Sequence, residues 1–249
     1  MKKSSSLKYL AAFAAIALAT AAHAQTTYPG NLNTGFGGEI GMGSLTLNNT
    51  GTTLTGTIVT NGDAFGDYLV IYIDSTGGGF TSTSGFTDTG DAHRRAISGF
   101  DGSNTAVLTF APTFDADYAI AVNPSFGGLW DVNAGTSHTF ISSVGFALTG
   151  TNTYTFSVSL ASLGVGVGST FDFSTTYLSD TAYRSNEAYQ AIVGTAADGA
   201  GNFGRNDDVI GAFNTYTVVP EPGTWIAGAL VFGALALTQR RRFARGRVA

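Results

Sequence analysis

The chain of 249 residues contains no cysteine, and only 12% of its residues are charged. The absence of cysteine excludes a disulfide framework, a thiolate metal site and a cysteine nucleophile. Lysine occurs only at positions 2, 3 and 8. Glycine, in contrast, occurs 34 times, about twice its average share of roughly 7%. The hydrophobic content of 43% is too high for a charged, intrinsically disordered chain.

The charges divide the chain into three segments. Residues 1–24 carry three lysines and no acid, residues 25–219 carry a net charge of −12, and residues 220–249 carry +4. We interpret these segments as a signal peptide, an extracytoplasmic domain and a C-terminal sorting segment. Because an acidic surface repels phosphate, the middle segment is not expected to bind nucleic acid or anionic lipid.

The first segment has the pattern of a secretory signal peptide. Two lysines precede a mostly apolar stretch at 7–19, and Ala22-His23-Ala24 fits the small-x-small rule for signal cleavage. The mature chain is therefore predicted to begin at Gln25. The alternative interpretation, a short membrane anchor, is disfavoured because the apolar stretch is short.

An uncharged stretch at 222–239 predicts a single C-terminal transmembrane helix. Its 18 residues reach roughly 27 Å as a helix, close to the roughly 30 Å of a hydrocarbon core. Trp225 at one edge is typical of a membrane interface, and the arginines at 240–242 resist translocation. The body is then expected in the periplasm, anchored to the inner membrane. A buried core helix is the alternative interpretation.

The same segment resembles a PEP-CTERM sorting signal. The resemblance covers roughly residues 218–245 and rests on a motif, an apolar stretch and a basic cluster in that order: Pro220, Glu221 and Pro222, then 222–239, then Arg240, Arg241 and Arg242. It implies recognition by an exosortase-type membrane peptidase, removal of the anchor, and release or attachment at the surface of a Gram-negative bacterium that makes exopolysaccharide. Gly223 departs from the more usual serine.

The middle segment has the period-two pattern of β-strands. Apolar residues alternate with Thr and Ser over 154–160, and 68–73 is the continuous apolar run expected of a strand buried on both faces. Turn sequences rich in Gly, Asn and Asp separate about ten such runs. The expected fold is all-β, an antiparallel β-sandwich of jelly-roll type. No helix is expected in this segment, 77–100 is expected to be an irregular loop, and a β-solenoid is the alternative.

Four stretches of the middle segment, taken in order, resemble DOMON-like sandwich modules related to family 9 carbohydrate-binding modules. They are 68–79, 114–123, 154–169 and 171–187. The resemblance implies a sandwich that binds glycans. Such kinship lies at the level of the fold and does not transfer a ligand.

The middle segment offers few groups for catalysis. His93 is expected in a solvated loop and His138 on a strand facing solvent or an edge, and no Gly-x-Ser-x-Gly elbow occurs. The only glutamates are Glu39 and Glu187, so no glycosidase pair stands out. The glycine run 164–168 lacks the lysine of a phosphate loop. We expect no enzyme and no cofactor, and a hydrolase with an unrecognised Asp pair is a distant alternative.

Clustered acids suggest the hypothesis that the protein binds a structural Ca²⁺. Such an ion would raise the melting temperature of residues 25–219, which thermal unfolding with and without calcium would test. Ca²⁺ takes six to eight oxygen ligands, and such oxygens gather at Asp63/Asp67, Asp88/Asp91, Asp115/Asp117 and 206–208. No Asp-x-Asp-x-Asp-Gly loop is present. The alternative is that these side chains bond to the backbone in turns.

Sugar recognition uses aromatic faces together with amide and carboxylate hydrogen bonds. The candidate glycan contacts are Trp130, Tyr183, Asn186 and Tyr189. The leading interpretation is an exported, non-enzymatic surface or extracellular-matrix protein with a structural or adhesive role in exopolysaccharide. The alternative is a carbohydrate-binding module with a defined glycan site.

Overall fold

Strands dominate the described part of the chain. The computed structural model describes residues 25–62, 65–190, 192–195 and 207–220. Besides strands, the described residues contain the helix α2 (Ala92–Ser98) and the 3₁₀ turns η1 (Thr83–Gly85) and η2 (Leu160–Leu163). The strands are β1 (Thr26–Pro29), β2 (Ser44–Asn49), β3 (Thr53–Val59), β4 (Tyr68–Asp74), β5 (Leu108–Thr109), β6 (Tyr118–Asn123), β7 (Phe126–Asp131), β8 (Thr139–Ser143), β9 (Ala147–Leu148), β10 (Thr153–Ser159), β11 (Thr170–Leu178), β12 (Ile192–Thr195), β13 (Asp208–Ile210) and β14 (Asn214–Thr217).

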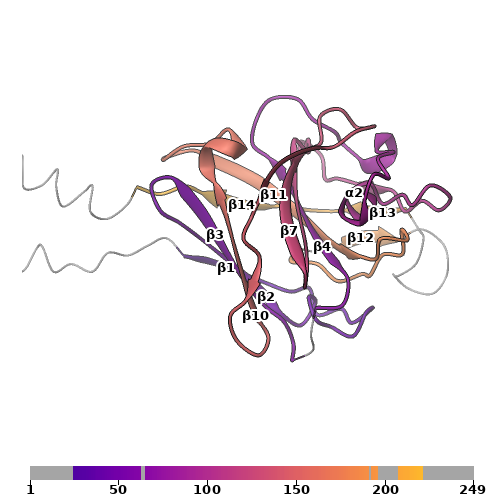
Figure 1. Cartoon of the computed structure of the whole chain (residues 1–249), viewed down its shortest axis with the longest axis horizontal. Coiled ribbons are helices and arrows are strands. Elements are labelled where there is room, and N and C mark those ends of the chain that lie inside the picture. The colour runs from indigo at the N-terminus through magenta and orange to yellow at the C-terminus, as the bar shows by residue number, and fades with distance from the viewer. Residues whose placement is uncertain (1–24, 63–64, 191, 196–206, 221–249) are drawn as a thin grey trace, which may run out of the picture. The chain divides into compact units, whose positions relative to one another are not determined.

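The first sheet has the order β1-β2-β3-β10-β9, and all its neighbouring strands are antiparallel. Four of its strands, β1, β2, β3 and β10, are labelled in Figure 1. Buried residues alternate with more exposed ones along β2, β3 and β10, because successive side chains of a strand point to opposite faces. The alternation predicted for 154–160 is confirmed. Phe156 lies opposite Gly56, where a Cβ would come within 2.1 Å of its ring, so the ring packs directly over the glycine.

The second sheet has the order β14-β11-β4-β6-β7-β8, again antiparallel throughout. The five central residues of β4 are all buried. Leu69 and Ile71 join one hydrophobic cluster, whereas Val70 and Tyr72 join another. The prediction that this strand is buried on both faces is confirmed.

Two hydrophobic clusters flank the second sheet. The first cluster takes Leu45 and Ile58 from one sheet and Ile120 and Phe173 from the other, so it fills the space between the two sheets. The second contains residues of β4, β6 and β7 together with residues of α2 and of the chain around β5. The expected all-β architecture with antiparallel sheets is confirmed, in a sandwich-like arrangement.

A short third sheet, β12-β13-β5, contains the parallel pair β13 and β5. Arg184, which is fully buried, links these strands to the chain after β11. Its guanidinium donates to the carbonyls of Ala106 at 2.6 Å and Val107 at 3.0 Å, and it pairs with Asp208 at 3.3 Å. Removing one partner of such a buried pair is strongly destabilising, because the other charge is left uncompensated.

The prediction of no helix between 77 and 100 is wrong. The carboxylate of Asp91 accepts the N–H of Arg94 at 2.9 Å and caps the start of α2, and Gly99 ends the helix with a φ of 60°. Gly99 suits this left-handed position because it has no Cβ. Seven residues are too few to display a helical period in the sequence.

The sequence Phe126-Gly127-Gly128 has the glycine pair of a turn, but these residues begin β7. A Cβ at Gly127 would lie 2.6 Å from the side chain of Phe146, so the glycine permits close packing on that face. A glycine pair that resembles a turn signal is here a packing requirement within a strand.

The predicted signal peptide and membrane span lie outside the described residues. The same holds for Glu221 and Pro222 of the motif and for the arginines at 240–242. Within the described ranges, no helix has the length and apolar character needed to cross a membrane.

A buried carboxylate fixes the segment between β1 and β2. The side chain of Glu187 is fully buried and accepts four backbone N–H bonds at 2.6 to 3.2 Å, from Phe36, Gly38, Ile40 and Gly41. The hydroxyl of Ser185 donates to the same carboxylate at 3.1 Å. Because unpaired buried N–H groups are costly, Glu187 replaces a strand partner for this segment.

Replacing Glu187 with glutamine is expected to destabilise the protein. The NH₂ group of glutamine would face N–H donors, and each buried donor left unpaired costs about 1–3 kcal/mol. We expect urea denaturation to show a loss of roughly 3 kcal/mol or more in the free energy of unfolding. The control Asp172→Asn removes the same charge at a surface site, where the carboxylate accepts from the hydroxyl of Thr215. Equal losses in the two variants would contradict the role assigned to Glu187.

Candidate functional site

Trp130 is not an exposed platform for a sugar ring. It is 2% exposed, and its ring stacks on His93 with centroids 5.6 Å apart and meets Phe140 edge-on at 5.5 Å. The physical reason is that α2 covers this face of the second sheet, so the side chain packs there instead of facing solvent.

The other three predicted contacts lie between β11 and β12. Tyr183 is half-buried and stacks on Phe36 at 5.9 Å. The side-chain oxygen of Asn186 accepts the N–H of Gly35 at 3.0 Å. Tyr189 is 2% exposed and belongs to the first hydrophobic cluster. Each of these side chains supports the fold, and of the four predicted glycan contacts Tyr189 lines the pocket described next.

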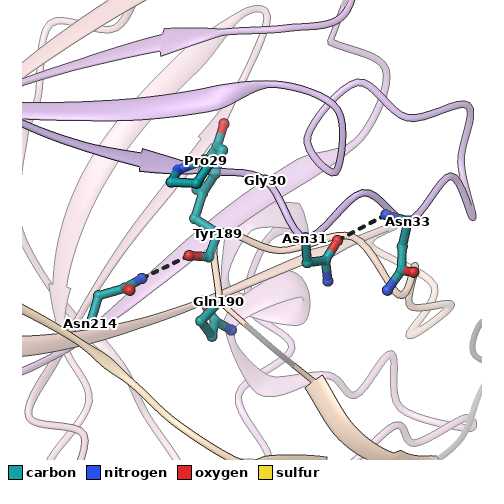
Figure 2. Close-up of a pocket in the computed structure, with 7 residues that line it drawn as sticks. All are labelled: Pro29, Gly30, Asn31, Asn33, Tyr189, Gln190 and Asn214. Atoms are coloured by element: carbon teal, nitrogen blue, oxygen red, sulfur yellow. Dashed lines mark hydrogen bonds between the residues drawn. The ribbon is translucent and has the colours of Figure 1, made fainter.

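A pocket of about 450 Å³ lies beside Tyr189 (Figure 2). This volume falls within the roughly 300–1,000 Å³ that is typical of small-molecule sites. Three parts of the chain form its walls: the end of β1 with the loop that follows, the residues after Ala188, and the start of β14. The lining residues are Pro29, Gly30, Asn31, Asn33, Tyr189, Gln190 and Asn214.

Backbone partners hold the asparagine amides of the pocket. The side-chain nitrogens of Asn31 and Asn33 both donate to the carbonyl of Asn186, at 2.8 and 3.0 Å. The side-chain oxygen of Asn31 accepts the N–H of Asn33 at 3.2 Å, and the amide of Asn214 donates to the carbonyl of Tyr189 at 2.9 Å (Figure 2). The walls are therefore positioned before any ligand arrives.

The chemistry of this lining suits neutral polar ligands. A carboxamide presents both an acceptor oxygen and a donor nitrogen, which matches the hydroxyl groups of a sugar. Gln190 is committed to Thr175, because its oxygen accepts the N–H at 3.0 Å and the hydroxyl at 2.7 Å. The seven lining residues carry no charged side chain.

The sequence analysis missed six of the seven lining residues, among them the four that carry side-chain amides, Asn31, Asn33, Gln190 and Asn214. They come from distant parts of the chain, and each one alone resembles an ordinary turn or strand-end residue. The single local signal is the pair Asn31 and Asn33 directly after β1.

A buried serine and histidine lie within hydrogen-bonding distance, but they do not form a hydrolase triad. Ser98 Oγ lies 2.9 Å from His138 Nε2, and both residues are 1% exposed. Asp88 accepts the backbone N–H of His138 at 2.6 Å, and the ring Nδ1 has no partner. A triad needs an acid that orients the ring and an accessible hydroxyl. The pair instead links α2 to the residue that precedes β8.

Both histidine predictions are wrong. His138 is buried instead of facing solvent or an edge, and its ring meets Phe86 edge-on at 4.9 Å. His93 lies on α2 and not in a solvated loop, half-buried with its ring 5.0 Å from that of Tyr68. Burial lowers the pKa of both rings, that of His138 to about 4.

Clustered acids of the described residues serve turns and helix caps. Asp117, for example, accepts the N–H groups of Ser75 and Thr76 at 2.9 and 2.8 Å. In the described ranges, no group of three or more His, Asp or Glu side chains is arranged to hold a metal ion. Asp63 and Asn206 lie outside those ranges. The alternative predicted for these acids, bonding to the backbone in turns, accounts for the described contacts of Asp117.

Comparison with known proteins returned no match among family models, curated proteins or solved structures.

Acid is expected to weaken the fold through His138. Its folded-state pKa of about 4 lies below the ordinary value of about 6.5. Its contribution to stability is fully present above pH 6.5 and is lost as the pH falls toward 4, because the unfolded chain takes up the proton first. We expect the free energy of unfolding, measured by urea titration at each pH, to fall by roughly 3 kcal/mol across that window.

The variant His138→Gln isolates this effect, because it removes the titrating ring and keeps a polar group near Ser98. We expect it to flatten most of the pH dependence between pH 6.5 and 4. The matched variant His93→Gln, at a half-buried position, should flatten a smaller part. A slope that is unchanged in His138→Gln would refute the assignment.

Proposed function

We propose that the protein is an exported surface or extracellular-matrix protein with a structural or adhesive role in exopolysaccharide. Two sequence features support export: the signal-peptide pattern at 1–24 and the sorting-signal order of 220–222, the apolar stretch and 240–242. In this proposal an exosortase-type peptidase of the inner membrane processes the tail. The body then passes from the periplasm to the cell surface or the extracellular matrix.

The amide-lined pocket is the observation that supports the adhesive role. Its lining is uncharged, and its asparagines are held in place by backbone hydrogen bonds. A site of this kind exchanges the water around sugar hydroxyls for fixed amide partners. Because the lining offers neither a general acid nor a nucleophile, we propose binding without catalysis.

Weak contacts repeated along a polymer suit this pocket better than a single tight site. The ring of Tyr189 is buried, so the lining presents no exposed aromatic face on which a sugar ring could stack. Each hydrogen bond exchanged with water contributes only about 0.5–1.5 kcal/mol. Many copies of the protein along one polysaccharide would raise the overall avidity.

A carbohydrate-binding module with a defined glycan site is the second candidate. The pre-positioned walls of the pocket favour it, since a rigid site loses less entropy on binding. The jelly-roll fold and the resemblance to DOMON-like modules are what a carbohydrate-binding module would have. The two facing antiparallel sheets support both proposals. A short oligosaccharide that binds in a saturable manner, without a polymer, would favour this candidate over the matrix role.

Export and processing predict defined ends for the mature chain. Mass spectrometry of the protein from the bacterium that makes it is expected to find Gln25 as the first residue and no peptide beyond about Pro222. The supernatant and surface fractions should contain this form. Recovery of the intact chain from the cytosol would overturn the proposed localisation.

Removing pocket amides is expected to weaken retention by exopolysaccharide. Asn33→Ala and Asn214→Ala each remove one carboxamide, and we expect each to lower the affinity about three- to tenfold. Electrophoresis of the mature protein through gels that contain the polysaccharide measures this loss. The control Asn133→Ala makes the same change in an exposed turn after β7. Unchanged retention of both pocket variants would rule out the pocket as the glycan contact.

A further inference from the structure

We propose that the amide-lined pocket selects uncharged polysaccharides and discriminates against acidic ones such as polyuronates. This inference rests on the proposed glycan-binding function and names the substrate class of the same site. Three features of the described residues support it: the pairing of the arginines, a buried negative charge near the pocket, and the neutrality of the pocket amides.

The described arginines are all paired with carboxylates. Lysine does not occur in the sequence between 25 and 219, so arginine is the residue that would bind an acidic sugar. The pairs are Arg94 with Asp88 and Asp91, Arg95 with Asp180 at 2.6 Å, and Arg184 with Asp208 at 3.3 Å. A sugar carboxylate would have to displace one of these partners, and none of the three arginines lines the pocket.

A buried negative charge lies behind one wall of the pocket, because Glu187 accepts the N–H of Gly41 and a Cβ on the lining residue Gly30 would lie 2.2 Å from the carbonyl oxygen of Gly41. Two of the lining asparagines are bonded to the carbonyl of Asn186, which precedes Glu187 in the chain. The carboxylate of Glu187 is bonded to four backbone N–H groups and one hydroxyl, all of which are neutral donors. These dipoles stabilise the charge without cancelling it. In a site partly screened from water, this charge repels an approaching carboxylate.

The pocket amides are neutral and offer no charge to an acidic sugar. The side-chain nitrogens of Asn31 and Asn33 already donate to the carbonyl of Asn186, and that of Asn214 donates to the carbonyl of Tyr189, the latter bond being drawn in Figure 2. Each of these nitrogens keeps a second N–H, so Asn33 and Asn214 can each offer a ligand an acceptor oxygen and one neutral donor. These neutral groups can exchange hydrogen bonds with a sugar hydroxyl, whereas they cannot compensate the charge of a carboxylate, which would lose hydration on entering the pocket.

Affinity electrophoresis of the mature protein tests this selectivity. The gels contain a neutral polysaccharide, dextran or galactomannan, or an acidic one, alginate or polygalacturonate, at equal mass concentration. At about 0.05 M salt, where charges act over roughly a nanometre or more, we expect retention by the acidic polymers to be at least about tenfold weaker. Raising the salt to about 0.5 M should reduce this difference, because the repulsion is screened.

A charge placed in the pocket should change the selectivity. Asn33→Lys supplies one cation at the wall, and we expect it to raise retention by alginate about tenfold at low salt. Retention by dextran should change no more than in Asn33→Ala. The matched control Asn133→Lys adds the same charge in the exposed turn after β7. Thermal unfolding of each variant verifies that it is folded.

The outcomes separate the inference from the proposed function. If acidic polymers retain the wild-type protein as strongly as neutral ones, the selectivity is refuted and the glycan-binding function stands. If neither class retains the protein, the proposed function fails and the inference fails with it. If Asn133→Lys raises retention by alginate as much as Asn33→Lys does, net charge and not the pocket determines the selectivity, and the inference is overturned.

Discussion

The carboxylate of Glu187 determines the shape of the pocket, because it holds a segment that has no strand partner. Residues between β1 and β2 need acceptors for their N–H groups, and Glu187 accepts from four of them. The backbones also approach closely here, since a Cβ at Gly30 would lie 2.2 Å from the carbonyl oxygen of Gly41. Glu187 lies two residues before Tyr189 in the chain, so one short stretch both anchors one wall of the pocket and supplies part of the other. The geometry of the site thus depends on one buried charge.

The second sheet explains why the proposed binding site is not on a sheet face. It has a hydrophobic cluster on each side, so its central strands have no face left for a ligand. The cover on the outer side, which includes α2, also buries Trp130. Binding surfaces are then left to the ends and edges of strands, and the pocket accordingly lies where β1 ends and β14 begins. The same packing that stabilises the sheets therefore determines which residues can meet a ligand.

The predictable parts of this structure are those in which one residue pattern determines one outcome. The alternation over 154–160 and the apolar run of β4 each reflect burial along a single strand, so local periodicity predicted them. The seven-residue helix α2 was not predictable in this way, because its stability comes from packing on the sheet and not from a long period. Burial of Trp130 and His138 depends on elements distant in the chain. The pocket depends on residues from 29 to 214, whose proximity no local pattern indicates.

The distribution of charge connects the fold to the proposed role. Positive charge gathers in the segments 1–24 and 220–249, which the sorting proposal removes, so the segment that remains carries a net charge of −12. Like charges keep such a protein soluble and its copies apart, and the described arginines are already paired within the fold. Attraction to a polymer must then come from groups without charge. Fixed asparagine amides are such groups, and hydrogen bonds between neutral partners persist at salt concentrations that screen ionic contacts. In the proposed role outside the cell, amide contacts to a hydrated polysaccharide would keep their strength at salt concentrations that weaken ion pairs.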